Sequence, residues 1–170
     1  AVLATPHLSP HPALYHAART LIAFFRTVPD LVWALLFVVS VGLGPFAGTL
    51  ALVVDKIGFC GRFFAEAMEE VDRGPQEALS AMGASRLSII ACAVIPAALP
   101  SFINTSLFSL EKATRSSVIL GLVGAGGIGI ELKVAMDLFS YDEAATIILA
   151  IFALVLIVER FSAWLRQRLI

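Results

Sequence analysis

The sequence predicts an all-α protein, a polytopic bundle of transmembrane helices with about four spans. Three observations carry this prediction: 59% of the 170 residues are hydrophobic, only 15% are charged, and residues 31–54 contain no charge at all. A water-exposed domain of this length must cover a large surface, for which 12 basic and 13 acidic residues are too few. The mean hydropathy of +0.91 therefore indicates a chain whose main solvent is lipid.

Residues 1–18 form the first segment, which we interpret as a linker or the remnant of a preceding segment. Its prolines, at positions 6, 10 and 12, disfavour a helix before about Pro12. The sequence begins without Met or a signal peptide, so we expect an N-terminally truncated fragment. Residues 19–170 are then the transmembrane domain.

The uncharged run 31–54 is long enough to span a membrane, but it is interrupted at Gly42, Gly44 and Pro45. We therefore expect two helices, one starting at Pro29 and one running from Pro45 to about Met68. The second helix includes four charged residues: Asp55, Lys56, Arg62 and Glu66. Charged groups within a span should face protein or water, and Arg62 can pair with Glu66 four residues later.

A polar loop at about 69–95 follows. Pro75 fits the first position of a short helix, Glu77 suits its first turn, and Gly83 suits a left-handed stop. Ser85 can then cap a second short helix that begins at Arg86. We expect an elbow of two short helices in an aqueous phase.

The remaining chain predicts two further spans. The first covers residues 96–116, and the second is centred on the apolar run 146–158. Between them lies a glycine-rich segment that is too short to span as an ordinary helix.

Positive charge is unevenly distributed. With four spans, one face of the membrane receives Arg19, Arg26, Arg73, Arg86 and the arginine-rich C-terminus, while the segment 117–143 on the other face holds only Lys133. The positive-inside rule then places the elbow loop and the C-terminus in the cytoplasm.

Gly124, Gly126 and Gly129 match the G-x-G-x-x-G pattern of dinucleotide-binding enzymes, with Glu143 downstream. That fingerprint needs a preceding strand and further βαβ units, for which too little chain remains. We prefer to interpret these glycines, together with Gly127, as positions of close backbone packing. A phosphate-binding G-x-x-x-x-G-K-[ST] loop is absent from the sequence, so any ATP would be bound by another chain.

The elbow carries a family resemblance. Glu77-Ala78-Leu79, Gly83 and Ile95-Pro96 resemble the E-A-A-x3-G-x9-I-x-L-P signature of permease subunits in bacterial ATP-binding-cassette importers. Three positions differ from the signature: Leu79 stands for Ala, Ala93 for Ile and Ile95 for Leu. Longer stretches, at 26–34, 42–45, 64–67 and 121–129, are similar to the phosphonate-type permeases, and the resemblance covers roughly residues 6–168.

The resemblance implies the partners and the location. It implies a homodimer of permeases in the bacterial inner membrane, two cytoplasmic ATPase subunits that bind ATP and Mg, and an external solute-binding protein. Lipid is expected to surround the domain, and no nucleic-acid partner is expected. Carried over by position, Glu77, Ala78, Leu79, Gly83 and Pro96 belong to the loop that couples to the ATPase.

The predicted function is inward movement of phosphonate or a related oxyanion by alternating access. Lys112 and Arg115 are candidates for the substrate path, with Glu111 tuning their field. We assign no catalytic residue, no metal site and no cofactor to this chain. Three alternatives stay open: a permease for methionine, phosphate or phosphite, the dinucleotide-binding membrane enzyme, and a structural membrane anchor.

Overall fold

The computed structural model describes residues 1–169, and within them every regular element is a helix, so the predicted all-α fold is confirmed. The elements are, in chain order, η1 (Val2–Ala4), α1 (Pro12–Thr27), α2 (Asp30–Val41), α3 (Pro45–Glu69), α4 (Gly74–Ala81), α5 (Arg86–Ile89), the π-helical turn η2 (Ile90–Val94), α6 (Ile95–Leu122), α7 (Ile128–Asp137) and α8 (Tyr141–Leu169).

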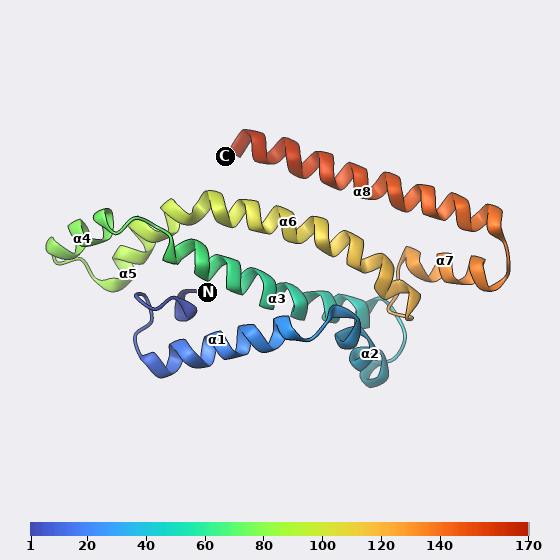
Figure 1. The fold of residues 1–170 in the computed structure, drawn as a ribbon, viewed down its shortest axis with the longest axis horizontal. Coiled ribbons are helices and arrows are strands. Elements are labelled where there is room, and N and C mark those ends of the chain that lie inside the picture. The colour runs from blue at the N-terminus through green and yellow to red at the C-terminus, as the bar shows by residue number, and fades with distance from the viewer. Residues whose placement is uncertain (170) are drawn as a thin grey trace.

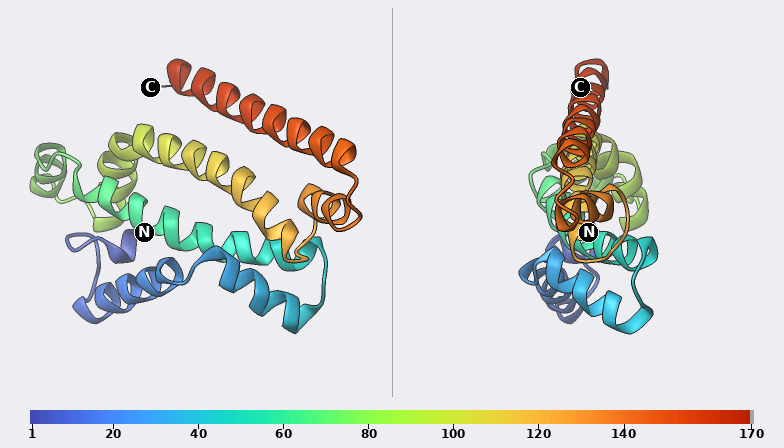
Figure 2. Two further views of the ribbon diagram at one scale, coloured as in Figure 1. Left: turned by 45° about the vertical axis from the view of Figure 1, so that its right-hand side comes forward. Right: turned by 90° about the vertical axis from the view of Figure 1, so that its right-hand side faces the viewer.

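Three long helices, α3, α6 and α8, lie lengthwise in one bundle, and α1 lies along α3 (Figures 1 and 2). We call the end that holds residues 70–85 the elbow end; α1 begins there, and α8 runs back toward it. The opposite end, here the glycine end, holds the α2–α3 turn and the loop at 123–127. The bundle therefore presents α4 and the arginine-rich end of α8 on the same side.

The helices differ in how well they suit a membrane. Arg86–Leu122 and Tyr141–Arg168 are long and apolar enough to cross it, and α1 with α2 forms a third candidate span that is bent by 86°. Helix α3 has the length of a span, but Asp55, Lys56 and Arg62 interrupt its apolar sequence. Of the four expected spans, length and composition thus support two, or three if the bent pair is one span.

Small residues bring α3 against α6 and the glycine loop. Ala51 of α3, Leu120 of α6, Ala34 of α2 and Ala125 of the loop form one buried cluster. A Cβ atom at Gly48 would collide with the carbonyl oxygen of Ala125. The absence of side chains therefore sets the spacing of these segments, as in membrane helix packing generally.

The elbow differs from the expected pair of short helices. Ser85 caps the second helix as predicted, since its Oγ accepts a hydrogen bond from the backbone N of Ser88 at 3.3 Å. That helix does not end near Ile95, because α5, η2 and α6 form one continuous stretch, Arg86–Leu122. The expected start of a span at Pro96 is therefore wrong: the π-helical turn just before Pro96 is wider than an α turn, and it relieves the clash of the proline ring with the backbone.

The N-terminal segment is more helical than its prolines suggest. Helix α1 begins at Pro12, in the first helical turn where proline is tolerated, and the His11 ring nitrogen accepts a hydrogen bond from the backbone N of Ala13 at 3.1 Å. The expected boundary at residue 18 therefore falls inside α1. The division into a linker and a domain stays a prediction.

We expect Gly126→Ala to lower stability more than Gly127→Ala. Both glycines have a positive φ, so each substitution costs about 1–2 kcal/mol of backbone strain. Only at Gly126 would the new Cβ also clash, 2.5 Å from Cα of Pro45, whereas the space at Gly127 is open. Thermal unfolding of the purified variants in one detergent measures the difference, and equal midpoints would contradict the close contact at Pro45.

Candidate functional site

The first candidate region is helix α4, which stands at the tip of the elbow. Asp72 Oδ1 accepts a hydrogen bond from the backbone N of Gly74 at 3.2 Å, and Glu77 occupies the first turn. At the other end, the N–H of Ala84 bonds to the carbonyl of Leu79 and the N–H of Gly83 to that of Ser80. This pair of bonds, with Gly83 at φ +78°, is a Schellman stop. Both ends of the helix are therefore fixed by local bonds.

The outer face of α4 is open. Ala78 is exposed, Leu79 is half-buried, and the helix contacts α5 and η2 behind it. Glu77 is also exposed, but it borders the cavity on the inner side of the helix. Gly83 and Pro96 are also exposed. A short, rigid helix with a free face can be received by a groove on another protein.

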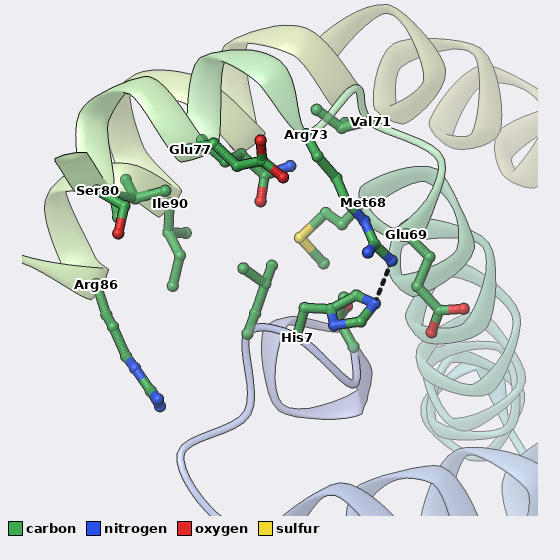
Figure 3. Close-up of a pocket in the computed structure, with 13 residues that line it drawn as sticks. His7, Met68, Glu69, Val71, Arg73, Glu77, Ser80, Arg86 and Ile90 are labelled. Carbon is green, nitrogen blue, oxygen red and sulfur yellow. Dashed lines mark hydrogen bonds between the residues drawn. The ribbon is translucent and has the colours of Figure 1, made fainter.

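Behind α4 lies a cavity of about 310 Å³ between the elbow and the N-terminal segment (Figure 3). Arg73 Nη2 donates a hydrogen bond to His7 Nε2 at 2.6 Å across it, because a guanidinium has no acceptor. Glu77, Ser80 and Arg86 also line the cavity. The N-terminal segment therefore supports the elbow, a contact 66 residues apart in sequence for which the sequence carries no signal.

The predicted substrate-path residues lie on α6, where each makes an ion pair. Lys112 Nζ is 3.4 Å from Asp55 Oδ2, and Lys56 Nζ is 2.7 Å from the same oxygen. The Asp55 side chain is only 10% exposed. One buried carboxylate of α3 is thus shared by two ammonium groups and links α3 to α6.

Glu111 and Arg115 link α6 to α8. Glu111 Oε1 is 2.6 Å from Arg166 Nη2, and Arg115 lies between Glu159 at 3.5 Å and Glu111 at 4.0 Å. The Glu111 side chain is 11% exposed, whereas that of Arg115 is 53% exposed. The structure therefore joins Glu111, Lys112 and Arg115 to acids and bases on both neighbouring long helices.

The other charged pair of α3 follows the spacing rule. Arg62 Nε donates to Glu66 Oε1 at 2.6 Å, as their separation of four residues predicts. The interhelical pairs of Asp55 and Glu111 follow no such rule, because 57 and 55 residues separate their partners. Only the apolar surroundings of these residues indicate that each needs an opposite charge.

The four glycines at 124–129 have two different environments. Added Cβ atoms would collide with Leu43 at Gly124, with Pro45 at Gly126 and with the carbonyl of Val118 at Gly129. At Gly127 the space is open, and only its φ of +81° favours glycine. Close packing therefore explains glycine at three of these positions, whereas at Gly127 only the backbone conformation explains it.

The comparisons agree with this fold. The whole chain, residues 1–170, matches the family of binding-protein-dependent transport system inner membrane components, and the chain therefore belongs to that family. Members of that family are components of membrane transport systems, so this chain is a transporter membrane subunit and not an enzyme.

Several relatives are named for phosphorus oxyanions. The chain is 43% identical over 169 residues to the phosphate-import permease protein PhnE of Mycolicibacterium smegmatis, covering 99% of this chain and 32% of the relative. It is 44% identical over 162 residues to the putative phosphite transport system permease protein HtxE of Stutzerimonas stutzeri, covering 95% and 62%. It is 34% identical over 121 residues to the putative cryptic phosphonate transport system permease protein PhnE2 of Escherichia coli, covering 71% and 99%. The chain thus spans less than two thirds of the first two relatives.

A solved structure has the same fold. One chain in a structure of the MetNI methionine transporter, in inward-facing conformations, superposes with a TM-score of 0.82, covering 98% of this chain and 81% of that chain. The identity is 24%, so the likeness concerns the fold alone.

The dinucleotide alternative is wrong. Gly124 and Gly126 lie in the loop between helices α6 and α7, Gly129 lies in the first turn of α7, and residues 1–169 contain no strand to precede such a fingerprint.

We expect Asp55→Asn to destabilise the bundle by about 1–3 kcal/mol. The substitution leaves Lys56 and Lys112 without their shared carboxylate; the cost stays below that of a fully buried pair because the Lys112 side chain is 42% exposed. Glu66→Gln is the control, since it removes an exposed pair and should cost less than about 1 kcal/mol. Denaturant titration of both purified variants distinguishes them, and a smaller loss for Asp55→Asn than for Glu66→Gln would show that the shared carboxylate is not structural.

Proposed function

We propose that this chain is the permease subunit of an ATP-binding-cassette importer that moves phosphonate or a related phosphorus oxyanion into the cell. The observation that carries the proposal is helix α4, a rigid and exposed helix at the elbow whose sequence resembles the coupling signature of such permeases. The names of the relatives support an oxyanion as the substrate.

In this proposal the permease works as a homodimer with two cytoplasmic ATPase subunits and an external binding protein. Glu77, Ala78 and Leu79 dock into the ATPase, and Gly83 lets the chain turn into the long helix that starts at Arg86. Because that helix continues without a break to Leu122, a displacement of α4 can reach the glycine end. Rigid-body movement of this kind is how alternating access is commonly achieved.

Lys112 and Arg115 are our candidates for the substrate path. Both side chains stay about half exposed while they contact acids, so each retains N–H donors for a passing anion. Glu111 holds Arg115 and Arg166 and thereby sets the local field. In this proposal the anion exchanges with carboxylates that already neutralise the cations.

Among possible solutes, phosphite and phosphate are the nearest alternatives to phosphonate, because the relatives named for them are 43–44% identical. Methionine is not favoured, since the methionine import system permease protein MetP of Bacillus subtilis is 31% identical to this chain, below the 43–44% of the phosphate and phosphite permeases.

The cytoplasmic orientation of the elbow predicts one-sided labelling. With Cys60 and Cys92 replaced by serine, we expect Ser80→Cys to be protected in intact cells from an impermeant maleimide and to react after permeabilisation. Leu138→Cys, exposed at the turn between α7 and α8, should react in intact cells. Labelling of Ser80→Cys from outside, with the permeabilised control working, would place α4 on the wrong side for an ATPase.

Coupling through α4 predicts that Gly83→Asp sharply lowers transport. Asp adds strain at a positive φ and a charge at the docking face, and losing a coupling free energy of about 1–3 kcal/mol lowers uptake by about 5- to 150-fold. Gly42→Asp is the matched control, because Gly42 also has a positive φ in open space but lies at the glycine end.

Uptake is measured as growth of a strain lacking the gene on phosphonate, phosphite or phosphate as the single phosphorus source. Equal growth of the two variants would favour the structural-anchor alternative. Growth that is restored on none of these sources, with membrane insertion intact, would reject the substrate class.

A further inference from the structure

A second cavity lies between α1 and α3, close to the elbow end. Its volume is about 310 Å³, and it is lined by Ala4, Arg19, Thr20, Ile22, Ala23, Arg62 and Ala65. Two arginines from different helices therefore border one hollow whose remaining walls are mostly apolar. Neither arginine belongs to the elbow or to the proposed substrate path.

The two guanidinium groups are held in place, yet they keep free donors. Arg19 Nη1 donates to Tyr15 Oη at 2.6 Å and to Glu69 Oε1 at 3.2 Å, while Arg62 Nε donates to Glu66 Oε1. A guanidinium carries five N–H donors, so these bonds leave most of the donors of Arg62 and several of Arg19 available. The Arg62 side chain is 51% exposed and that of Arg19 is 38% exposed.

The guanidinium groups of the cavity can bind an anion. Arg19 and Arg62 are each balanced by one glutamate, Glu69 and Glu66 respectively, so the attraction rests on their free N–H donors and not on a net charge. Arg26, which lies over the ring of Phe63 at 5.7 Å, is not part of the cavity lining. Planar guanidinium groups match the oxygens of a phosphate group, which they can bind with two parallel hydrogen bonds.

The surroundings of the cavity indicate that this phosphate belongs to the headgroup of a lipid. Helix α1 has no buried residue, and Leu21 and Phe24, which adjoin lining residues in the sequence of that helix, are more than half exposed. Arg62 lies seven residues before the end of α3, which places it near one end of the bundle rather than at its middle. A phosphate bound at this depth has apolar side chains next to it that can contact acyl chains.

We propose that Arg19, Arg62 and Thr20 form a binding site for the headgroup phosphate of an anionic phospholipid. The two arginines bind the phosphate oxygens from opposite helices, the Thr20 hydroxyl donates a further bond, and the acyl chains run along the exposed apolar side chains of α1. The bound lipid thereby joins α1 to α3. This site is independent of the transported solute.

The test uses the permease purified in mild detergent and titrated with phosphatidylglycerol, with bound lipid counted by native mass spectrometry. We expect phosphatidylglycerol to be retained on the order of tenfold more strongly than phosphatidylcholine, and Arg19→Gln with Arg62→Gln to remove that preference. Arg26→Gln is the control, because it removes a charge from the same helix but does not line the cavity, and it should keep the preference.

A variant that is expected to raise lipid retention distinguishes loss of the site from a folding defect. Glu66→Gln removes the carboxylate that competes for Arg62, so it should raise phosphatidylglycerol retention, whereas general damage would lower it. Retention that is unchanged in the double variant, or equal for the two lipids, overturns the proposal. Displacement of the lipid by millimolar inorganic phosphate would assign the site to free phosphate and overturn it as well.

Discussion

The close approach of α3 to α6 is the constraint on which the rest of the bundle depends. Lipid tails provide no hydrophobic driving force between helices, so packing of small residues and pairing of charges must hold them together. At the glycine end, Gly48 and Ala51 let Ala125 and Leu120 approach. Nearer the middle, Asp55 links Lys112 of α6 to Lys56 of its own helix. A larger residue at Gly48 or Ala51 would also displace the Asp55–Lys112 pair, because both contacts join α3 to α6 or to the loop that follows α6.

The same arrangement explains how charged residues are accommodated in an apolar chain. The shared carboxylate of Asp55 and the carboxylate of Glu111, whose side chain is 11% exposed, each hold two cations, and their bonds run from α6 to α3 on one side and to α8 on the other. Charges that would be costly in lipid thus become contacts between helices. Helix α6 is therefore fixed on both flanks near its centre, and at the elbow end its buried Ala98 packs in one cluster with Met68 of α3.

The features that sequence could predict are those set by neighbours in the chain. The Ser85 cap, the left-handed stop at Gly83 and the Arg62–Glu66 pair each involve residues within a few positions of one another. The pairing of Asp55 with Lys112 and of His7 with Arg73 depends on how distant segments pack, for which spacing gives no rule. The sequence does not predict the continuity of 86–122, because Pro96 ordinarily marks a helix start, whereas here a π-helical turn accommodates the proline inside a longer helix. The role of the elbow as a coupling site and that of Lys112 and Arg115 rest on resemblance and remain proposals.

The π-helical turn at Ile90–Val94 also gives the long helix a defined point at which it can bend. Its weaker backbone geometry and the missing N–H of Pro96 leave this turn more compliant than the α-helical segments on either side. The arm beyond it, α6, has 28 residues and is about 42 Å long. A bend of about 10° at this turn would displace the two ends of an arm of that length by about 7 Å relative to each other.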